Sequence, residues 1–400
     1  MILFLVFLFA YTLSQFYRSF LAVIAPTLSA ELGLTPGDLA NMSAAWFGVF
    51  ALAQFPLGVA LDRYGPRRTV PALMMAGVLG ALWLARARGA GDCMTALALI
   101  GLGCSPIYMG ALYYFARMET PERFGFLSAG LLGFGSAGNL LAATPLAFAV
   151  ETFGWRGSFV GLAFLMLLSA ALFLTVVRDP PPAPLPKVHT SALQALQQVA
   201  RLPKLWTLMP LLTLGYACVV VERGLWVGPY FAGVHGLTPV PLGNAVLAMA
   251  VTMSLGALAF GALDRIFSGR RKLFVTIGTG LAASGFLALS LVPHAGLGTA
   301  IATMAFIGFV GLCHPLLFTH ARTFYPDHLL GRGITFANFL TIGGAGVVHF
   351  ASGTYVERLS ANGASASATY AALHLAFATT MLAALAIYLL SPAHPAKPKA

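Results

Sequence analysis

The sequence predicts an all-α membrane protein with twelve transmembrane helices in two pseudo-symmetric six-helix bundles. Three observations predict this fold: an apolar composition, long apolar runs and an internal repeat. Of the 400 residues, 58% are apolar and 9% are charged, and the mean hydropathy is +0.84. A soluble domain carries roughly 25% charged residues, so the composition indicates an integral membrane protein.

Twelve apolar runs are long enough to cross the hydrocarbon core, which takes about 20 helical residues. Numbered in chain order, helices 1 to 12 are expected at 2–26, 39–61, 69–87, 93–116, 124–148, 155–177, 206–231, 242–263, 273–293, 298–320, 332–354 and 369–390. The runs are too long for barrel strands and lack the alternation that such strands show. Helices are therefore expected in every run.

The two halves of the chain repeat each other at an offset of 203 residues. The matches at this offset are Gly-Leu-Thr-Pro at 33–36 and 236–239, Pro26 and Pro229, Asn41 and Asn244, Gly58 and Gly261, Arg67-Arg68 and Arg270-Arg271, and Gly77 and Gly280. We therefore interpret the halves as parallel repeats. Each Gly-Leu-Thr-Pro is expected in an outer loop, where Gly ends one helix and Pro begins the next.

The repeat defines the expected domains. Residues 1–177 form an N-terminal six-helix bundle, 178–205 a cytoplasmic linker, 206–391 a C-terminal six-helix bundle and 392–400 a cytoplasmic tail. Five prolines between Pro180 and Pro186 predict a stiff, extended spacer. After them, Thr190-Ser191 can cap a short helix.

The basic residues predict that both termini are cytoplasmic. Of the 23 lysines and arginines, 17 lie on the side that holds the linker, the tail and the loops after the even-numbered helices. This is the pattern of the positive-inside rule. The net charge of +11 is thereby explained by membrane topology, and no nucleic-acid partner is expected.

Several other classes of function find no support in the sequence. The four cysteines have no CxxC spacing and lie in or beside apolar runs, so they predict packing residues and neither disulfides nor a metal site. A P-loop, an HExxH motif and a GxSxG motif are all missing, and no aqueous segment is long enough to fold alone. We therefore expect neither an enzyme nor a pump, and no cofactor.

Three charged residues fall inside predicted spans. Arg18 lies in helix 1, and Glu222 and Arg223 lie in helix 7, the repeat counterpart of helix 1. A charge at mid-helix costs roughly 3 kcal/mol on insertion scales, so such residues usually face a cavity or a partner. Glu222 and Arg223 are about 100° apart around a helix, so they do not face each other. A structural ion pair between Glu222 and an arginine is the alternative.

Parallel six-helix halves are the arrangement of major facilitator transporters, and several residues also resemble that superfamily. The loop between helices 2 and 3 is similar to its signature, and the second half carries a degraded copy; the residues concerned are Gly58, Asp62, Arg63, Gly65, Arg67 and Arg68, then Asp264 and Arg265. The resemblance implies a conformational latch, in which Asp62 contacts the opposing half around Gly331 to Gly333. Gly154-Trp155-Arg156 is another recurring feature of the superfamily.

Helix 1 carries a narrower resemblance. Gln15-Phe16-Tyr17-Arg18, followed by seven residues and then Pro26, resembles the helix 1 pattern of anion:cation symporters and organophosphate transporters. The resemblance implies that Arg18 binds an anionic substrate. Tyr17 stands where that family has a proton-coupling Asp, so the coupling role does not carry over to it. Glu222 could supply that role instead.

Further polar and aromatic residues in the spans are weaker candidates. Tyr17, Tyr108, Arg223, Trp226 and Asn338 are expected to contribute to substrate binding, and His314 is a second candidate for proton coupling. For the aromatic residues and for His314, packing inside the bundle is the competing interpretation. Sodium remains an alternative coupling ion.

The leading hypothesis is a proton-coupled secondary transporter of a small organic anion: a carboxylate, an amino acid or a phosphate ester. An efflux antiporter of drugs or amphipaths is the second, and a non-transporting receptor or assembly factor with the same fold is the third. The expected setting is a monomer in the lipid bilayer of a bacterial inner membrane.

Overall fold

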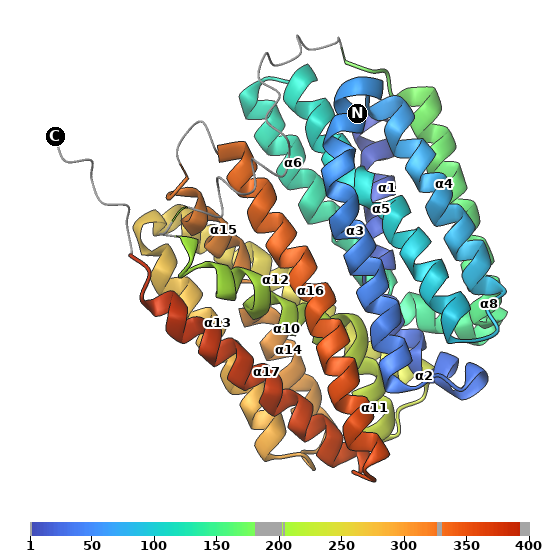
Figure 1. Ribbon diagram of the computed structural model, residues 1–400, viewed down its shortest axis with the longest axis vertical. Coiled ribbons are helices and arrows are strands. Elements are labelled where there is room, and N and C mark those ends of the chain that lie inside the picture. The colour runs from blue at the N-terminus through green and yellow to red at the C-terminus, as the bar shows by residue number, and fades with distance from the viewer. Residues whose placement is uncertain (1, 181–201, 203–204, 326–329, 393–400) are drawn as a thin grey trace. The chain divides into compact units, whose positions relative to one another are not determined.

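The computed structural model describes residues 2–180, 202, 205–325 and 330–392 (Figure 1). The short helix expected in the linker and nearly all of the expected tail lie outside these residues. The described residues form helices and no strands. Two compact units contain them: unit 1 has residues 1–186, 224–232 and 236–247, and unit 2 has residues 187–223, 233–235 and 248–400.

The helices of the first half are α1 (Ile2–Tyr17), α2 (Leu21–Leu32), α3 (Pro36–Tyr64), α4 (Pro66–Ala85), α5 (Ala90–Met118), α6 (Pro121–Gly135), α7 (Ala137–Leu141) and α8 (Thr144–Val176). The helices of the second half are η2 (Leu211–Gly215), α10 (Tyr216–Val221), η3 (Glu222–Trp226), α11 (Val227–His235), α12 (Pro239–Ile266), η4 (Ser268–Arg270), α13 (Arg271–Leu291), α14 (Leu297–Gly311), α15 (His314–Arg322), α16 (Leu330–Ala361) and α17 (Ala366–Leu389). Among the described residues, 11 helices are long and apolar enough to span a membrane, or 12 when α1 and α2 count as one bent span. The predicted all-α membrane fold is confirmed.

The two Gly-Leu-Thr-Pro segments have the conformation that the repeat predicts. Gly33 ends α2 with φ 66°, and Gly236 ends α11 with φ 65°. This left-handed conformation is one that glycine adopts without a steric penalty. Pro36 and Pro239 are the first residues of α3 and α12. The same four residues therefore form the same helix–turn–helix junction in both halves.

The expectation of one continuous helix over 2–26 is wrong. The helix stops at Tyr17, resumes at Leu21 and bends by 47° between the two parts. In the break, the Ser19 hydroxyl donates to the Asn139 side chain. The Ser19 side chain in the break is thereby tied to the segment that joins α6 to α8.

The second part of helix 1 packs closely against helix 7. Pro26 has no N–H group, so the carbonyl of Ala22, four residues earlier, has no helical donor. At this carbonyl Gly228 of α11 makes its closest approach, and a Cβ atom at Gly228 would overlap it. Close helix contact through a small residue is common in membranes, and it explains why residues 224–232 belong to unit 1.

Other predicted spans are also irregular. Helix 7 contains two π-helical segments, η2 and η3. Helix 10 is interrupted between α14 and α15, where Pro315 removes a backbone donor near the start of α15. Helix 5 is interrupted between α6, α7 and α8, and α8 continues into predicted helix 6 through a kink at Gly154, whose φ is 69°.

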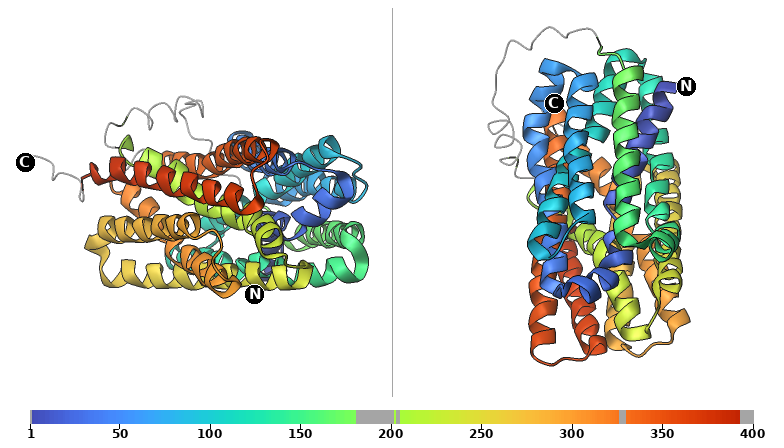
Figure 2. Two further views of the ribbon diagram at one scale, coloured as in Figure 1. Left: turned by 90° about the horizontal axis from the view of Figure 1, so that it is seen from below. Right: turned by 90° about the vertical axis from the view of Figure 1, so that its right-hand side faces the viewer.

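In unit 1, α5 packs against both α3 and α4, and the right-hand view of Figure 2 shows blue and light-blue helices of this part of the chain side by side. The contact between α5 and α3 depends on Gly101. A Cβ atom at Gly101 would lie 2.5 Å from the carbonyl oxygen of Trp46. Gly101 therefore fixes the position of Trp46, which is 2% exposed.

One end of unit 1 is joined by a polar cluster around Glu31. Its carboxylate accepts hydrogen bonds from the Trp155 indole (2.5 Å) and from the Arg156 guanidinium. Arg156 also donates to the carbonyl of Ala87 (3.2 Å). The Gly154-Trp155-Arg156 segment thus connects helices 1, 3 and 6.

The start of α4 is held by Asp179, which follows α8. The Asp179 carboxylate accepts from the backbone N–H of Arg67 (2.8 Å), where a negative charge also interacts favourably with the helix dipole. Arg67 donates through Nε to the carbonyl of Leu174 (3.1 Å). Gly65 has φ 75°, and a Cβ atom there would overlap the Asp179 carboxylate.

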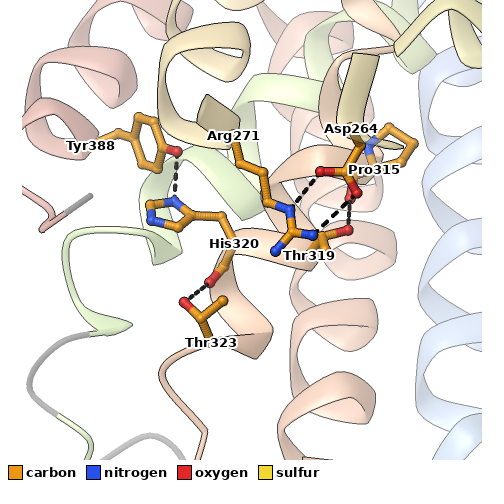
Figure 3. A network of polar contacts seen from close by, with 7 residues as sticks. All are labelled: Asp264, Arg271, Pro315, Thr319, His320, Thr323 and Tyr388. Carbon is orange, nitrogen blue, oxygen red and sulfur yellow. Dashed lines mark hydrogen bonds and ion pairs between the residues drawn. The ribbon is translucent and has the colours of Figure 1, made fainter. Parts of the chain in front are cut away.

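In unit 2, α13 and α17 lie side by side (Figure 1). Lys272 of α13 donates to the carbonyls of Leu389 (2.7 Å) and Ser391 (2.5 Å) at the end of α17. Figure 3 shows the neighbouring network, in which the His320 ring hydrogen-bonds to the Tyr388 hydroxyl at 2.7 Å. These contacts fix the carboxyl-terminal end of α17 to α13 and α15.

We predict that Gly101→Ala destabilises the protein and that Gly48→Ala does not. The methyl group at position 101 meets backbone on α3, so overpacking should cost about 1–3 kcal/mol. A Cβ atom at Gly48 has no atom within 4 Å. Melting of the two variants in detergent compares them directly. Equal melting temperatures would contradict the described contact between α5 and α3.

A double-mutant cycle tests the start of α4. Gly65→Ala should lower the melting temperature because of the overlap with Asp179 and because the backbone conformation of Gly65, φ 75° and ψ 163°, costs alanine roughly 1–3 kcal/mol. In an Asp179→Ala background the overlap is gone, so the same substitution should cost less. An identical cost in both backgrounds would show that Gly65 and Asp179 do not interact.

Candidate functional site

Arg18 lies in the break between α1 and α2. Its guanidinium carbon is 5.6 Å from the ring centroid of Trp46 and 5.4 Å from that of Phe50. These two rings are stacked on each other on α3, with centroids 5.1 Å apart. Cys104 of α5 is within electrostatic range of Arg18. Three helical segments therefore surround a half-buried cation.

The polar atoms around Arg18 are donors without acceptors. Arg18 Nε, the Trp46 indole nitrogen and the Tyr17 hydroxyl are buried and have no hydrogen-bond partner among the described residues. No carboxylate of the described chain lies within ion-pair distance of Arg18. Unpaired buried donors beside a cation provide what an anion needs. Tyr17 itself is 2% exposed and packs against Phe16 and Phe20.

Glu222 has a histidine as its neighbour. Its Oε1 lies 3.5 Å from Nε2 of His374 on α17, and both side chains are almost fully buried. The expected alternative, a structural ion pair between Glu222 and an arginine, stays a prediction. Glu222 is the first residue of the π-helical segment η3.

The remaining predicted residues of helix 7 are also buried. Arg223 is 3% exposed and Trp226 is fully buried. The ring of Tyr216 stacks on the ring of His314, with centroids 4.4 Å apart and nearly parallel planes. In this conformation these residues therefore pack within the protein, and their proposed contact with substrate stays a prediction.

His314 belongs to a second polar group in unit 2. Its Nε2 is 3.4 Å from the Thr341 hydroxyl of α16. Thr341 in turn donates to the carbonyls of Leu212 (3.1 Å) and Ala337 (3.0 Å). The group links α15, α16 and the π-helical segment η2. Of the other predicted binding residues, Tyr108 is half-buried against Tyr11, and Asn338 is half-buried on α16.

The predicted latch residues lie at helix ends. Asp62 is 3.4 Å from Arg117 of α5, and Asp264 accepts from Arg271 at 2.5 and 3.4 Å (Figure 3). The side chains of Arg63, Arg68 and Arg265 are exposed, and a Cβ atom at Gly58 would have no neighbour within 4 Å. The expected contact of Asp62 with residues 331–333 involves side chains outside the described part of the chain and stays a prediction.

Sequence reasoning missed four residues of these sites: Trp46, Phe50, His374 and Asp179. Trp46 and Phe50 are four residues apart, so they share one helix face and could have been noted as a platform for Arg18. His374 is an ionisable residue inside an apolar run, and the rule that selected Glu222 applies to it equally. Asp179 had no distinguishing pattern.

Comparison with known proteins places these features in a family. The model of the Major Facilitator Superfamily matches residues 7–349. Monocarboxylate transporter 11 of Mus musculus is 31% identical over 294 residues, which cover 67% of this chain and 62% of the relative. The probable nitrate/nitrite transporter NarK2 of Mycobacterium tuberculosis (strain H37Rv) is 25% identical over 265 residues, which cover 65% of this chain and 66% of the relative. The matched parts thus span under two thirds of the length of these relatives.

The fold is similar to that of solved transporters. An inward-facing, unoccupied crystal structure of a bacterial homologue of the human lysosomal transporter Spinster superposes with a TM-score of 0.81 at 16% identity. The superposition covers 97% of this chain and 96% of that one. Because the superfamily model matches most of the sequence and the helical fold agrees, the chain belongs to the Major Facilitator Superfamily.

Proposed function

We propose that the protein is a secondary transporter, not an enzyme, and that it moves a small monovalent anion across the membrane by alternating access. The observation that carries this proposal is Arg18, a half-buried cation at a helix break with an unpaired Nε and no acidic neighbour in the described chain. The relatives named for monocarboxylate and nitrate/nitrite transport support the class of substrate.

Energetics favour an anion over a purely structural role for Arg18. A charged residue in the middle of a membrane span costs roughly 3 kcal/mol on insertion scales. Its contacts with Trp46 and Phe50 offset part of that cost, at about 0.5–2 kcal/mol for cation–π interactions. An aromatic platform leaves the hydrogen-bonding edge of the guanidinium available, and that edge binds carboxylates in a bidentate manner.

The helix break adds a second attraction for negative charge. The helix α2 has 12 residues and begins at Leu21, three residues after Arg18. The amino-terminal end of a helix carries a partial positive charge. Half-helices of discontinuous spans direct such ends at anionic substrate groups in several transporter folds. Arg18 and the start of α2 therefore both favour an anion at the break.

The balance of charge favours a monoanion. Monocarboxylates and nitrate each carry one negative charge, and one unpaired arginine neutralises one such charge. A phosphate ester would bring a second charge, for which unit 1 offers no further unpaired cation at this break among its described residues. We therefore place monocarboxylates and nitrate ahead of the phosphate esters.

The wider scheme follows from the repeat. The bundles 1–177 and 206–390 would rock about a midplane site, with both termini cytoplasmic in a bacterial inner membrane. The loop around Asp62 would act as the conformational latch, and a proton bound at Glu222 would drive transport, with His314 or sodium as alternatives. A substrate shifts the conformers only by its differential affinity for them.

We predict that Arg18→Lys weakens substrate binding about tenfold, or ~1.4 kcal/mol, although the charge is kept. An ammonium lacks the planar fork and is more strongly hydrated. The measurement is the concentration dependence of pyruvate and nitrate counterflow in proteoliposomes, with the exposed Arg86→Lys as the matched control. Unchanged counterflow in a folded Arg18→Lys protein would remove the main support for an anion site.

Trp46→Phe tests the unpaired indole nitrogen. The substitution keeps an aromatic ring beneath Arg18 but removes one buried donor, so substrate affinity should fall by about 1 kcal/mol. Trp83→Phe is the control, because Trp83 is half-exposed and its indole already donates to Asp92 (3.3 Å). If both variants bind pyruvate or nitrate like the parent, the Trp46 indole takes no part in the site.

A further inference from the structure

We propose that Glu222 and His374 together form the proton-binding site of the protein, as one pair that is separate from the anion site at Arg18. Its role in driving transport rests on the proposed function, whereas the binding of the proton does not. His374 enters this site from α17 and was not among the residues that the sequence singled out.

The geometry of the pair supports shared titration. Glu222 Oε1 and His374 Nε2 are 3.5 Å apart, and the side chains are 0% and 1% exposed, respectively. Neither carboxylate oxygen of Glu222 has a hydrogen-bond donor among the described residues. A buried carboxylate without donors is costly in its charged form, and the imidazole nitrogen of His374 is the group beside it that can carry a proton.

The proton balance of the pair has three states. With one proton the pair is neutral, either as a carboxylic acid beside a neutral imidazole or as a carboxylate beside an imidazolium. Loss of this proton leaves one negative charge, and gain of a second leaves one positive charge. Interacting groups of this kind titrate as a pair, and each protonation step belongs to both residues.

Other ionisable groups of the described chain lie near the pair. Tyr370, one turn before His374 on α17, and Cys218, one turn before Glu222 on α10, are within electrostatic range of Glu222. Arg223 follows Glu222 in the chain. On α13 the neighbour of the His374 ring is Phe286, with centroids 6.0 Å apart.

The neighbouring α16 carries a histidine of a different kind. His349 is 1% exposed, and its Nδ1 lies 2.8 Å from the carbonyl of Ala345 on its own helix. It therefore offers a matched control: a buried histidine on a membrane helix whose ring nitrogen lies against a backbone carbonyl.

The π-helical segment η3 contains both Glu222 and Gly224, and Gly224 lies near the backbone of Arg18. Glu222 begins this segment, and Gly224 lies two residues further on. A Cβ atom at Gly224 would lie 3.5 Å from the carbonyl oxygen of Arg18. Single π-helical turns inside α-helices are frequent at functional sites because they shift the helical register locally. A change of charge at Glu222 therefore acts on a segment that also contacts the backbone at Arg18.

Infrared difference spectroscopy of the reconstituted protein between high and low pH tests the pair without any substrate. We expect a protonated-carboxyl band in the parent that Glu222→Gln lacks. In His374→Gln the pH dependence of this band should change, because the carboxyl group has lost the imidazole beside it. His349→Gln should match the parent. The proposal is wrong if Glu222→Gln keeps the full band or if His374→Gln leaves its pH dependence unchanged.

Transport of pyruvate then tests the role of the pair. Glu222→Gln should keep pyruvate counterflow at equal pH but lose accumulation driven by a pH gradient. Full accumulation by this variant overturns the driving role. If the parent exchanges neither pyruvate nor nitrate, the proposed function fails instead, and the infrared result still decides whether the pair binds a proton. Glu222→Asp replaces Glu222→Gln if the latter does not fold, and should retain a carboxyl band.

Discussion

The break in helix 1 is the constraint on which the candidate site depends. It interrupts a membrane helix at residues 18–20 and so places the guanidinium of Arg18 against Trp46 and Phe50. Each part of the surrounding unit contributes to this arrangement. Gly101 allows α5 to approach α3 closely at Trp46. Asn139 accepts a hydrogen bond from the Ser19 hydroxyl in the break. The polar groups at the break are tolerated inside a membrane because other parts of the protein surround them.

Helices 1 and 7 are repeat counterparts, and each accommodates charged residues inside a membrane span in a different way. Helix 1 breaks and bends, whereas helix 7 stays continuous and takes up two π-helical segments. The break in helix 1 and the second of these segments, η3, occur where the chain places charged residues inside a span. In each case the backbone departs from the α-helix at the position of the charge, which aims the side chain at a partner: the rings of α3 for Arg18 and His374 of α17 for Glu222.

The sequence predicted the fold well because the membrane imposes strong, local rules. Length and hydropathy define spans, and Gly and Pro define their ends, so the junctions at Gly33-Pro36 and Gly236-Pro239 follow from residue type alone. The break at residues 18–20 was not predictable in this way. Pro26 marks a weakened bond to Ala22, but the break lies several residues earlier, where tertiary contacts with Asn139 decide the conformation.

The site was predicted less completely. Arg18 and Glu222 were found because a charge in hydrocarbon is costly wherever it lies. Their neighbours depend on which helix faces which, and a single sequence does not encode that directly. Trp46 and Phe50 resemble ordinary packing aromatics until α3 is placed beside Arg18. His374 becomes a candidate for the proton site only through its 3.5 Å contact with Glu222.

The central claim is that Arg18 binds the transported anion directly. Nuclear magnetic resonance of protein with ¹⁵N-labelled arginine measures it, with the Arg18 Nε–H signal assigned by its loss in Arg18→Lys. Titration with pyruvate or nitrate should shift this signal in a saturable manner, because Nε has no hydrogen-bond partner among the described residues and gains one on binding. If the signal stays fixed while the same anion undergoes counterflow, Arg18 is not the binding residue.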